Sequence, residues 1–327
     1  MSSKIGSDSQ IAREALQQGK LVAIPTETVY GLAANAYDEK AVTGIFLAKN
    51  RPSFNPLILH VYDVDQAQSF TGEWPQAAVK LAKTFWPGPL TLLLPRDATI
   101  VPDLVTAGSP LVAVRVPAHP VTRELLKMLD FPLAAPSANP SGYISPTTAQ
   151  HVHQQLGDKV SYILEGGQAT VGIESTIIGF DQDGNPLLYR LGGLSLSSIE
   201  DCVGPLRTAR DEHHKPATPG RLARHYAPET AFILGSREAL QQRKIDISEK
   251  VAILAFEKPW PNIPNEHQRV LSLTGDTAEA ARNLFRMMRE LDALGLSLIL
   301  AEEAPQEGLG PAINDRLFRA SYDTREM

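Results

Sequence analysis

Cysteine is almost absent from this sequence, because its 327 residues include only Cys202 and so cannot form an internal disulfide. No stretch approaches the roughly 18 uninterrupted apolar residues of a membrane span, and the first residues lack an apolar signal segment. Positive charge is not in excess, since 31 Lys and Arg stand against 37 Asp and Glu. These absences predict a cytoplasmic protein with no membrane anchor and no stable nucleic-acid binding.

The usual phosphate-binding loops are missing too. The sequence has no G-x-x-x-x-G-K-[ST] motif, and the segment 308–310 fails the dinucleotide fingerprint because Ile313 occupies the third glycine position. We interpret 308–310 as a turn that enters a helix. A nucleotide site in this chain must therefore be built from side chains and non-standard loops.

Histidine and cysteine are not arranged for metal binding or covalent catalysis. His151 and His153 have the wrong spacing to bind a metal from one helix face, and we interpret them, like His213-His214, as solvated. Cys202 has no nucleophile motif around it and is expected in the core. We predict no metal site in the protein itself.

What the sequence does contain indicates an α/β protein with more than one domain. Hydrophobic residues make up 43% and charged residues 21%, enough for a real core and unlike disordered or fibrous chains. Over residues 1–205, apolar strand-like runs alternate with amphipathic segments, which predicts helices on a mixed sheet. The expected strands are 21–24, 57–61, 90–94, 111–116, 132–135, 162–164, 175–179 and 187–189. The expected helices are one that Ser7-Asp8 caps and Gly19 closes, 38–49, 76–85, 120–129, and one that Ser145 caps, with Pro146 as its first residue, ending at Gly157.

Residues 206–230 interrupt this pattern and predict a linker. They contain three prolines and three histidines without apolar periodicity, and they form the only part with net positive charge, 5 − 3 = +2. Beyond them, strands at 231–234, 251–256, 270–273 and 296–301 with helices at 237–243 and 276–293 predict a smaller, separately cored, Rossmann-like α/β domain, 231–327.

Three polar clusters in the first domain follow expected strands or helices. They are 25–31, 49–56 and 134–142, and ligands of open α/β sheets gather where strands end. Each cluster has an ordinary alternative: the first and third could be turns, and Lys49 and Arg51 could complement a helix dipole rather than bind a triphosphate. Arg115, at the end of a strand, would be costly to bury without a partner.

Seven strings occur together and in order: PTETVYG, KNRP followed by NPL and His60, WPGPLT, VAVRVPAHP, APSAN, GIESTI and RHYAP. With them the chain resembles the YrdC-type L-threonylcarbamoyl-AMP synthases in their long two-domain form. The resemblance covers residues 7 to 230, and the trailing segment AINDRLFRAS fits as well. It implies a YrdC-like mixed twisted sheet with helices and an open cleft in 1–205, and a linker or lid over the active site in 206–230.

The resemblance also implies the activity. The family joins L-threonine, bicarbonate and ATP into L-threonylcarbamoyl-AMP with release of pyrophosphate, and a tRNA threonylcarbamoyl transferase complex then uses the product. ATP is a substrate, and Mg²⁺ is expected to accompany it. The chain departs from the archaeal KYKHYAP pattern at Leu222 and Ala223, while Arg224 keeps the cation.

Site residues are carried over from the same motifs. The implied catalytic group is Lys49, Arg51, Ser137 and Asn139. The implied L-threonine group is Thr26, His60, Arg115, Ala135 and Ser175. The implied ATP group is Arg51, Asn55, Ser137, Ser145, Arg190 and His225. Two other functions stay open from the residues alone: carbamoyl transfer through a carbamoyl adenylate, and a non-catalytic RNA-binding module.

Overall fold

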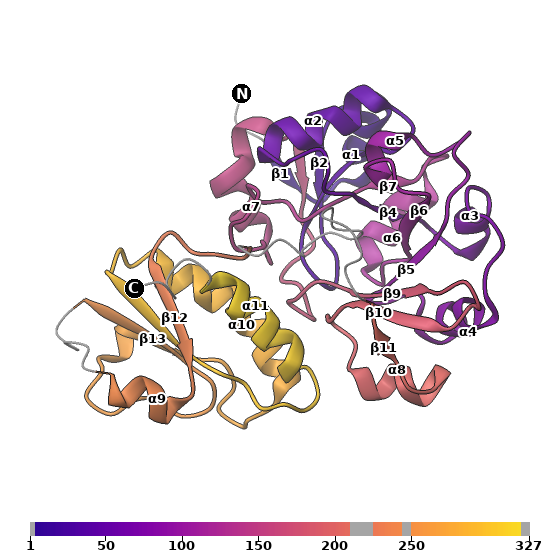
Figure 1. Ribbon diagram of the computed structural model, residues 1–327. Helices are drawn as coiled ribbons and strands as arrows, with labels where there is room; N and C mark the ends of the chain where they lie inside the picture. The colour runs from indigo at the N-terminus through magenta and orange to yellow at the C-terminus, as the bar shows by residue number, and fades with distance from the viewer. Residues whose placement is uncertain (1–3, 210–224, 244–249, 322–327) are drawn as a thin grey trace.

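A computed structural model describes residues 4–209, 225–243 and 250–321 of the chain (Figure 1). The described strands form two sheets, one of eleven strands within residues 4–208 and one of four within residues 231–302. In Figure 1 the larger sheet lies in the indigo to red part, and the smaller one lies in the orange and yellow part. The predicted α/β class is confirmed. His213, His214 and Arg224 lie outside the described residues.

The larger sheet mixes parallel and antiparallel neighbours in the order β1-β8-β2-β3-β7-β4-β6-β5-β9-β10-β11. For example, β4 is parallel to β6 but antiparallel to β7. The strands are β1 (Lys4–Gly6), β2 (Val22–Ile24), β3 (Gly31–Asn35), β4 (Ile58–His60), β5 (Leu90–Pro95), β6 (Leu111–Arg115), β7 (Leu133–Ala134), β8 (Tyr162–Leu164), β9 (Thr176–Phe180), β10 (Pro186–Arg190) and β11 (Arg207–Thr208).

Helices cover this sheet, and their ends follow local sequence signals. Asp38 caps α2 by accepting bonds from two backbone N–H groups, and Asn50 ends it in the left-handed conformation, which leaves Lys49 in the last turn. The helices are α1 (Ser9–Gln17), α2 (Glu39–Lys49), α3 (Val64–Gln68), α4 (Gln76–Phe85), α5 (Asp103–Thr106), α6 (Pro120–Lys127), α7 (Ala149–Leu156) and α8 (Leu196–Val203). No helix among the described residues is long and apolar enough to cross a membrane.

The predicted start of α7 is wrong. The cap is Thr148, whose Oγ1 accepts a bond from the backbone N–H of His151, and not Ser145. Tertiary contacts hold the earlier residues outside the helix: the Ser145 hydroxyl donates to Glu174 at 2.6 Å, and the Pro146 carbonyl accepts a 2.8 Å bond from the N–H of Tyr30.

Strand β3 was not predicted from the sequence. Its residues, Gly-Leu-Ala-Ala-Asn, have weak strand propensity, but backbone pairing with β2 and β7 on its two sides stabilises them in the middle of the sheet.

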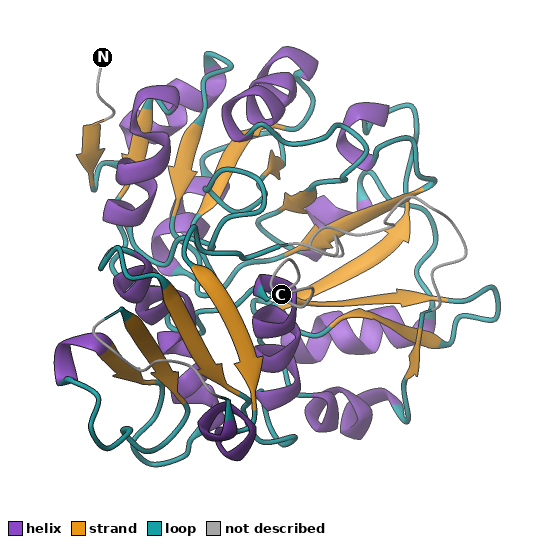
Figure 2. Cartoon of the chain, turned by 60° about the vertical axis from the view of Figure 1, so that its left-hand side comes forward, coloured by secondary structure: helices purple, strands orange, loops and turns teal. Residues whose placement is uncertain are grey.

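The smaller sheet is parallel throughout, in the order β12-β15-β13-β14, as expected of a Rossmann-like domain (Figure 2). Strand β14, 268–270, begins and ends earlier in the sequence than the predicted strand 270–273. The elements are β12 (Ala231–Gly235), α9 (Arg237–Gln242), β13 (Val251–Ala255), β14 (Gln268–Val270), α10 (Thr277–Asp292), β15 (Leu298–Glu302) and α11 (Gly310–Ala320).

The second part of the chain does not have the fully separate core that its sequence suggested. Val29, Ile144 and Ile173 of the first part belong to the same buried apolar cluster as Leu284 and Phe285 of α10. At Gly172, which has φ +82°, an added Cβ would lie 2.4 Å from the Cα of Arg282. Helix α10 therefore packs directly on a backbone that only glycine allows at this position.

Candidate active site

A cavity lies over one face of the larger sheet, and most of the predicted site residues line it. Because β4 and β7 are antiparallel, the cavity does not follow a common carboxyl edge of the strands, as the sequence had suggested. Instead, Ile58 and His60 of β4 point to the same face two residues apart, and Arg115 of β6 pairs in register with His60. The lining residues are Thr26, Thr28, Val29, Gly31, Arg51, Ile58, His60, Arg115, Ala135, Pro136, Ser137, Glu174, Ser175, Arg190, His225 and Tyr226.

Arg115 is buried but paired. Its NH2 forms a 2.6 Å ion pair with Glu27 Oε1, NH1 donates to Thr28 Oγ1 at 2.8 Å, and Nε donates to the carbonyl of Gly88 at 3.1 Å. Glu27 and Thr28 were not among the predicted site residues. The sequence did carry a signal for such a partner, because a strand-end arginine next to a core requires a carboxylate.

His60 is neutral in this environment. Burial and, to a lesser extent, the nearby Arg115 lower the pKa of its imidazole to about 3. Its Nδ1 has no hydrogen-bond partner among the described residues, although the side chain is buried. A neutral ring with a free nitrogen beside a cation is suited to a polar ligand group.

The loop after β2 is ordered by Thr26. Its Oγ1 donates to the carbonyl of Val29 at 2.6 Å and accepts bonds from the N–H groups of Thr28 and Val29. At the start of β9, Ser175 shares a 2.7 Å hydroxyl bond with Thr91 of β5. Thr91 was another polar partner not predicted from the sequence.

Lys49 does not line the cavity but lies directly behind it. Its Nζ donates to the carbonyl of Ser137 at 2.5 Å and to the carbonyl of Asn139, and burial, with Arg51, lowers its pKa well below the usual value. Helix α2 thereby fixes the loop that carries Ser137, whose own side chain reaches the cavity. The helix-dipole interpretation does not account for a lysine that is 1% exposed.

Two further arginines meet at the cavity. Arg51 donates to the carbonyls of Asn55 and Pro56, and burial, with Arg190 adding to it, lowers its pKa to about 9, which leaves it charged at neutral pH. Arg190 donates to the carbonyl of Ser175 at 2.8 Å and to its hydroxyl at 3.1 Å. Lys49 and Arg51 form no ion pair with a carboxylate among the described residues, so this side of the cavity is suited to an anion.

Besides Lys49, three predicted residues do not line the cavity. The Asn139 amide donates to the carbonyls of Pro140 and Tyr143, and the Ser145 hydroxyl donates to Glu174. The Asn55 side chain is buried with neither of its polar atoms bonded. The first two hold loops in place, whereas Asn55 keeps its donor and acceptor available.

The described end of the linker enters the cavity from outside the larger sheet. The ring of Tyr226 is stacked 5.4 Å from Phe285 of α10, and the ring of His225 lies 4.0 Å from that of Tyr226. Burial and the cations Arg51 and Lys49 lower the pKa of His225 well below its usual value. Tyr226 was not predicted as a site residue, although it stood in the RHYAP string.

The described residues contain no cluster of three or more His, Cys, Asp or Glu side chains that could hold a metal ion. Near the cavity, the carboxylates of Glu27 and Glu174 are already bound to Arg115 and Arg316. Both of these carboxylates are therefore engaged by arginines.

The fold and the cavity define a two-domain protein of the YrdC-like class with a cavity lined by three arginines. Residues 14–192 match the Sua5/YciO/YrdC family, described as "Telomere recombination", and residues 194–321 match the family described as "Threonylcarbamoyl-AMP synthase, C-terminal domain". The threonylcarbamoyl-AMP synthase of Pyrococcus abyssi is 42% identical over 95% of this chain and 93% of its own length. That of Bacillus subtilis is 38% identical over 96% and 94%.

Solved structures agree with these relatives. The crystal structure of P. abyssi Sua5 complexed with L-threonine has a TM-score of 0.87 at 40% identity and covers 96% of this chain and 94% of that one. Escherichia coli YciO, with 21% identity and a TM-score of 0.51, shares the fold alone. The chain belongs to the threonylcarbamoyl-AMP synthase family in its two-domain form, and it is an enzyme of the nucleotidyltransferase type.

Proposed function

We propose that this enzyme joins L-threonine, bicarbonate and ATP into L-threonylcarbamoyl-AMP, releases pyrophosphate, and so supplies the group that is transferred to an adenosine of tRNA. The observation that carries the proposal is that Arg51, Arg115 and Arg190 line one cavity. The reaction brings together two anions, the carbamate of threonine and the triphosphate. Cations already fixed in position offset their repulsion and stabilise the charge that develops on pyrophosphate.

Threonine binds, in this proposal, at the end of the cavity formed by Arg115, His60, Ser175, Thr26 and the backbone of Ala135. The three contacts of Arg115 use three of the five N–H donors of a guanidinium, so two remain for the threonine carboxylate. The free Nδ1 of neutral His60 and the hydroxyl of Ser175 can bond the threonine hydroxyl or amine.

ATP binds at the other end. Arg51 and Arg190, with His225, face its phosphates, and Asn55 has free polar atoms for the nucleotide. Lys49, Arg51, Ser137 and Asn139 form the catalytic group, in which Lys49 and Asn139 hold the loop that presents Ser137. Ser145 does not line the cavity, but its hydroxyl bonds Glu174, which does. A Mg²⁺ ion enters as part of the ATP complex.

The reaction needs no covalent enzyme intermediate. The amine of threonine takes up bicarbonate with loss of water, and an oxygen of the resulting carbamate attacks the α-phosphorus while pyrophosphate leaves. The enzyme contributes position, charge and exclusion of water, since the carbamate is short-lived in water.

We also propose that residues 206–230 connect the catalytic part, 1–205, with the C-terminal domain, 231–327. Residues 207–208 of this linker still pair with β10 as strand β11, and its described end, His225 and Tyr226, closes the site. The cavity has a volume of about 50 Å³, far below the roughly 300–1,000 Å³ typical of small-molecule sites, and His225 and Tyr226 are among the residues that line it. In this proposal ATP enters when this end of the linker moves. Cleavage near Arg221 by trypsin should be slower with ATP and threonine than without them, and equal rates would leave the linker a passive tether.

The direct test is pyrophosphate release with threonine and bicarbonate added singly and together. Turnover should require both, because neither alone supplies the carbamate. ATP cleavage at the same rate without threonine would indicate a plain ATPase instead. Carbamoyl phosphate in place of bicarbonate tests carbamoyl transfer, and retention of tRNA without any turnover would support the RNA-binding alternative.

We place the reaction in the cytoplasm, where ATP and tRNA are available, and expect the product to pass to a tRNA threonylcarbamoyl transferase complex. Neither a membrane nor a stable complex with nucleic acid is part of this proposal.

A further inference from the structure

Helix α11 of the C-terminal domain carries a fully buried arginine that lies near the candidate active site. Arg316 of α11 is 0% exposed, and its NH1 donates to the carbonyl of Leu191 at 2.6 Å. Leu191 follows Arg190 directly, so this bond joins α11 to the strand end that carries a cavity-lining cation. A charge with no access to water needs a partner, and Arg316 has two: Glu174 at 3.2 Å and Asp315 at 3.5 Å, of which Asp315 also pairs with Arg319.

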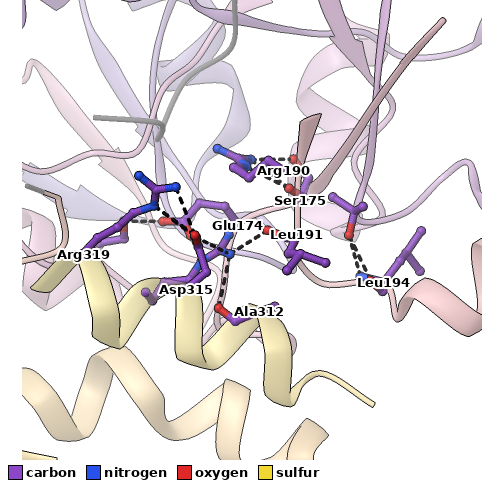
Figure 3. A network of polar contacts seen from close by, with 11 residues as sticks. Glu174, Ser175, Arg190, Leu191, Leu194, Ala312, Asp315 and Arg319 are labelled. Atoms are coloured by element: carbon purple, nitrogen blue, oxygen red, sulfur yellow. Dashed lines mark hydrogen bonds and ion pairs between the residues drawn. The ribbon is translucent and has the colours of Figure 1, made fainter. Parts of the chain in front are cut away.

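Glu174 is held from two sides. Its Oε2 accepts a 3.2 Å bond from Nε of Arg316, and its Oε1 accepts the 2.6 Å bond from the Ser145 hydroxyl. Figure 3 shows Glu174 lying above Ala312 and Asp315 of α11, with Arg190 and Ser175 beyond it. The carboxylate therefore lies between the C-terminal domain and the cavity.

Among the described residues that line the cavity, Glu174 is the only carboxylate. It lies near Arg190, which in turn lies near Arg51, and the proposed function assigns these two arginines to the triphosphate. An unpaired carboxylate at this position would repel the phosphates and compete for the arginines, and water in so small a cavity would screen it poorly.

Arg316 also contacts the residue that closes the cavity. Its guanidinium carbon lies 5.6 Å from the centre of the Tyr226 ring, and the N–H of His225 donates to the carbonyl of Arg319 one turn further along α11. The same helix thus holds Glu174 on one side and the His225-Tyr226 pair on the other.

We propose that Arg316 is a positioning residue for ATP binding: it neutralises Glu174 and fixes it against Ser145, so that the phosphates meet Arg51 and Arg190 without a competing negative charge. The C-terminal domain then completes the active site electrostatically without touching the substrates. That the bound anion is ATP rests on the proposed function, whereas the ion pair between Arg316 and Glu174 does not.

The test compares binding of α,β-methylene-ATP to the full-length wild type, to Arg316→Gln and to the double variant Arg316→Gln/Glu174→Gln. Arg316→Gln should raise the dissociation constant tenfold or more and raise the KM for ATP more than it lowers kcat. Because the double variant has no unpaired carboxylate, it should recover most of the lost affinity. A purely structural role would give no such recovery.

Arg289 of α10 provides a matched control. It is buried in the same interface and bonds the carbonyl of Ile144, the carbonyl of Ser145 and the side chain of Gln155, but not Glu174. Any effect of Arg289→Gln on nucleotide binding should not be reversed by Glu174→Gln. Equal recovery in both backgrounds, or no recovery in the Arg316 background, overturns the proposal.

Melting temperatures show whether each variant is folded at the assay temperature. If Arg316→Gln is unfolded, Arg316→Lys keeps the charge and should bind the analogue within about threefold of wild type, whereas a tenfold loss there also contradicts the proposal. Failure of the wild type to release pyrophosphate with threonine and bicarbonate would instead reject the proposed function and leave the binding comparison intact.

Discussion

Arg115 and Glu27 form a 2.6 Å ion pair in which both side chains are almost completely buried. The pair joins the end of β6 to the loop after β2, and the N–H of Ala118 adds a 3.1 Å bond to the other oxygen of Glu27. It therefore fixes two segments far apart in sequence and holds a cation in the cavity wall.

Glu27→Gln should lower the free energy of unfolding by about 3–5 kcal/mol, because it leaves Arg115 buried and uncompensated. Urea denaturation measures this change. The pair between the exposed Arg207 and Asp181 is the control, since an exposed ion pair contributes much less, and Arg207→Gln should have only a small effect. Equal losses in the two variants would mean that burial of the Arg115 pair does not matter.

Lys49→Met and Arg51→Ala should each slow pyrophosphate release by roughly a hundredfold or more, the usual cost of one preorganised electrostatic group. Lys49→Met should also destabilise the fold, because two buried carbonyls lose their donor at about 1–3 kcal/mol each. Arg51→Ala should cost less stability, because two of its carbonyl partners lie in its own loop. Full activity of both variants would contradict the catalytic assignment.

The dependence of kcat/KM on pH should distinguish the contribution of the Lys49 charge from those of the neighbouring cations. The pKa of Lys49 is lowered, so its charge, and with it kcat/KM, is lost as pH rises through that lowered value. Lys49→Arg stays charged and should move the alkaline fall in rate to higher pH, whatever its absolute activity. An unchanged alkaline limb would show that another group controls it.

Serine should replace threonine with reduced efficiency. The cavity has an apolar wall, formed by Val29, Ile58 and Ala135, next to the residues proposed to bind threonine. One methyl contact is worth about 1–3 kcal/mol. The ratio of kcat/KM for the two amino acids should thus fall between roughly ten and two hundred. Equal efficiency would place the threonine methyl outside this apolar wall.

Nucleotide binding should become tighter as pH falls through the range where His225 titrates. Burial and the neighbouring cations lower its pKa in the free enzyme, and a bound triphosphate raises it, so binding takes up a proton. Affinity for α,β-methylene-ATP, measured as the pH is lowered below the ordinary histidine pKa of 6.5, should show this trend. His225→Gln should retain only the titration of the nucleotide, and the same slope in both proteins would exclude His225.

The sequence by itself determined the class of fold, most of the helices and strands, and the residues that gather at the site. The family resemblance of its motifs assigned Thr26, Arg51, His60, Arg115 and Arg190 to one site, and all five line one cavity. Such motifs are local features that a sequence displays directly. The N-cap of α2 and the left-handed Asn50 show the same local control, since each is fixed by neighbours within a few residues.

Tertiary structure decided the rest, because those features depend on partners distant in sequence. Strand β3 exists through pairing with β2 and β7, and Ser145 is excluded from α7 by Glu174 and its surroundings. Arg115 is paired with Glu27 across 88 positions, and Arg316 with Glu174 across 142. No periodicity or motif encodes which buried charge neutralises which, because that choice is made only when the sheet and α11 bring the side chains together and exclude water.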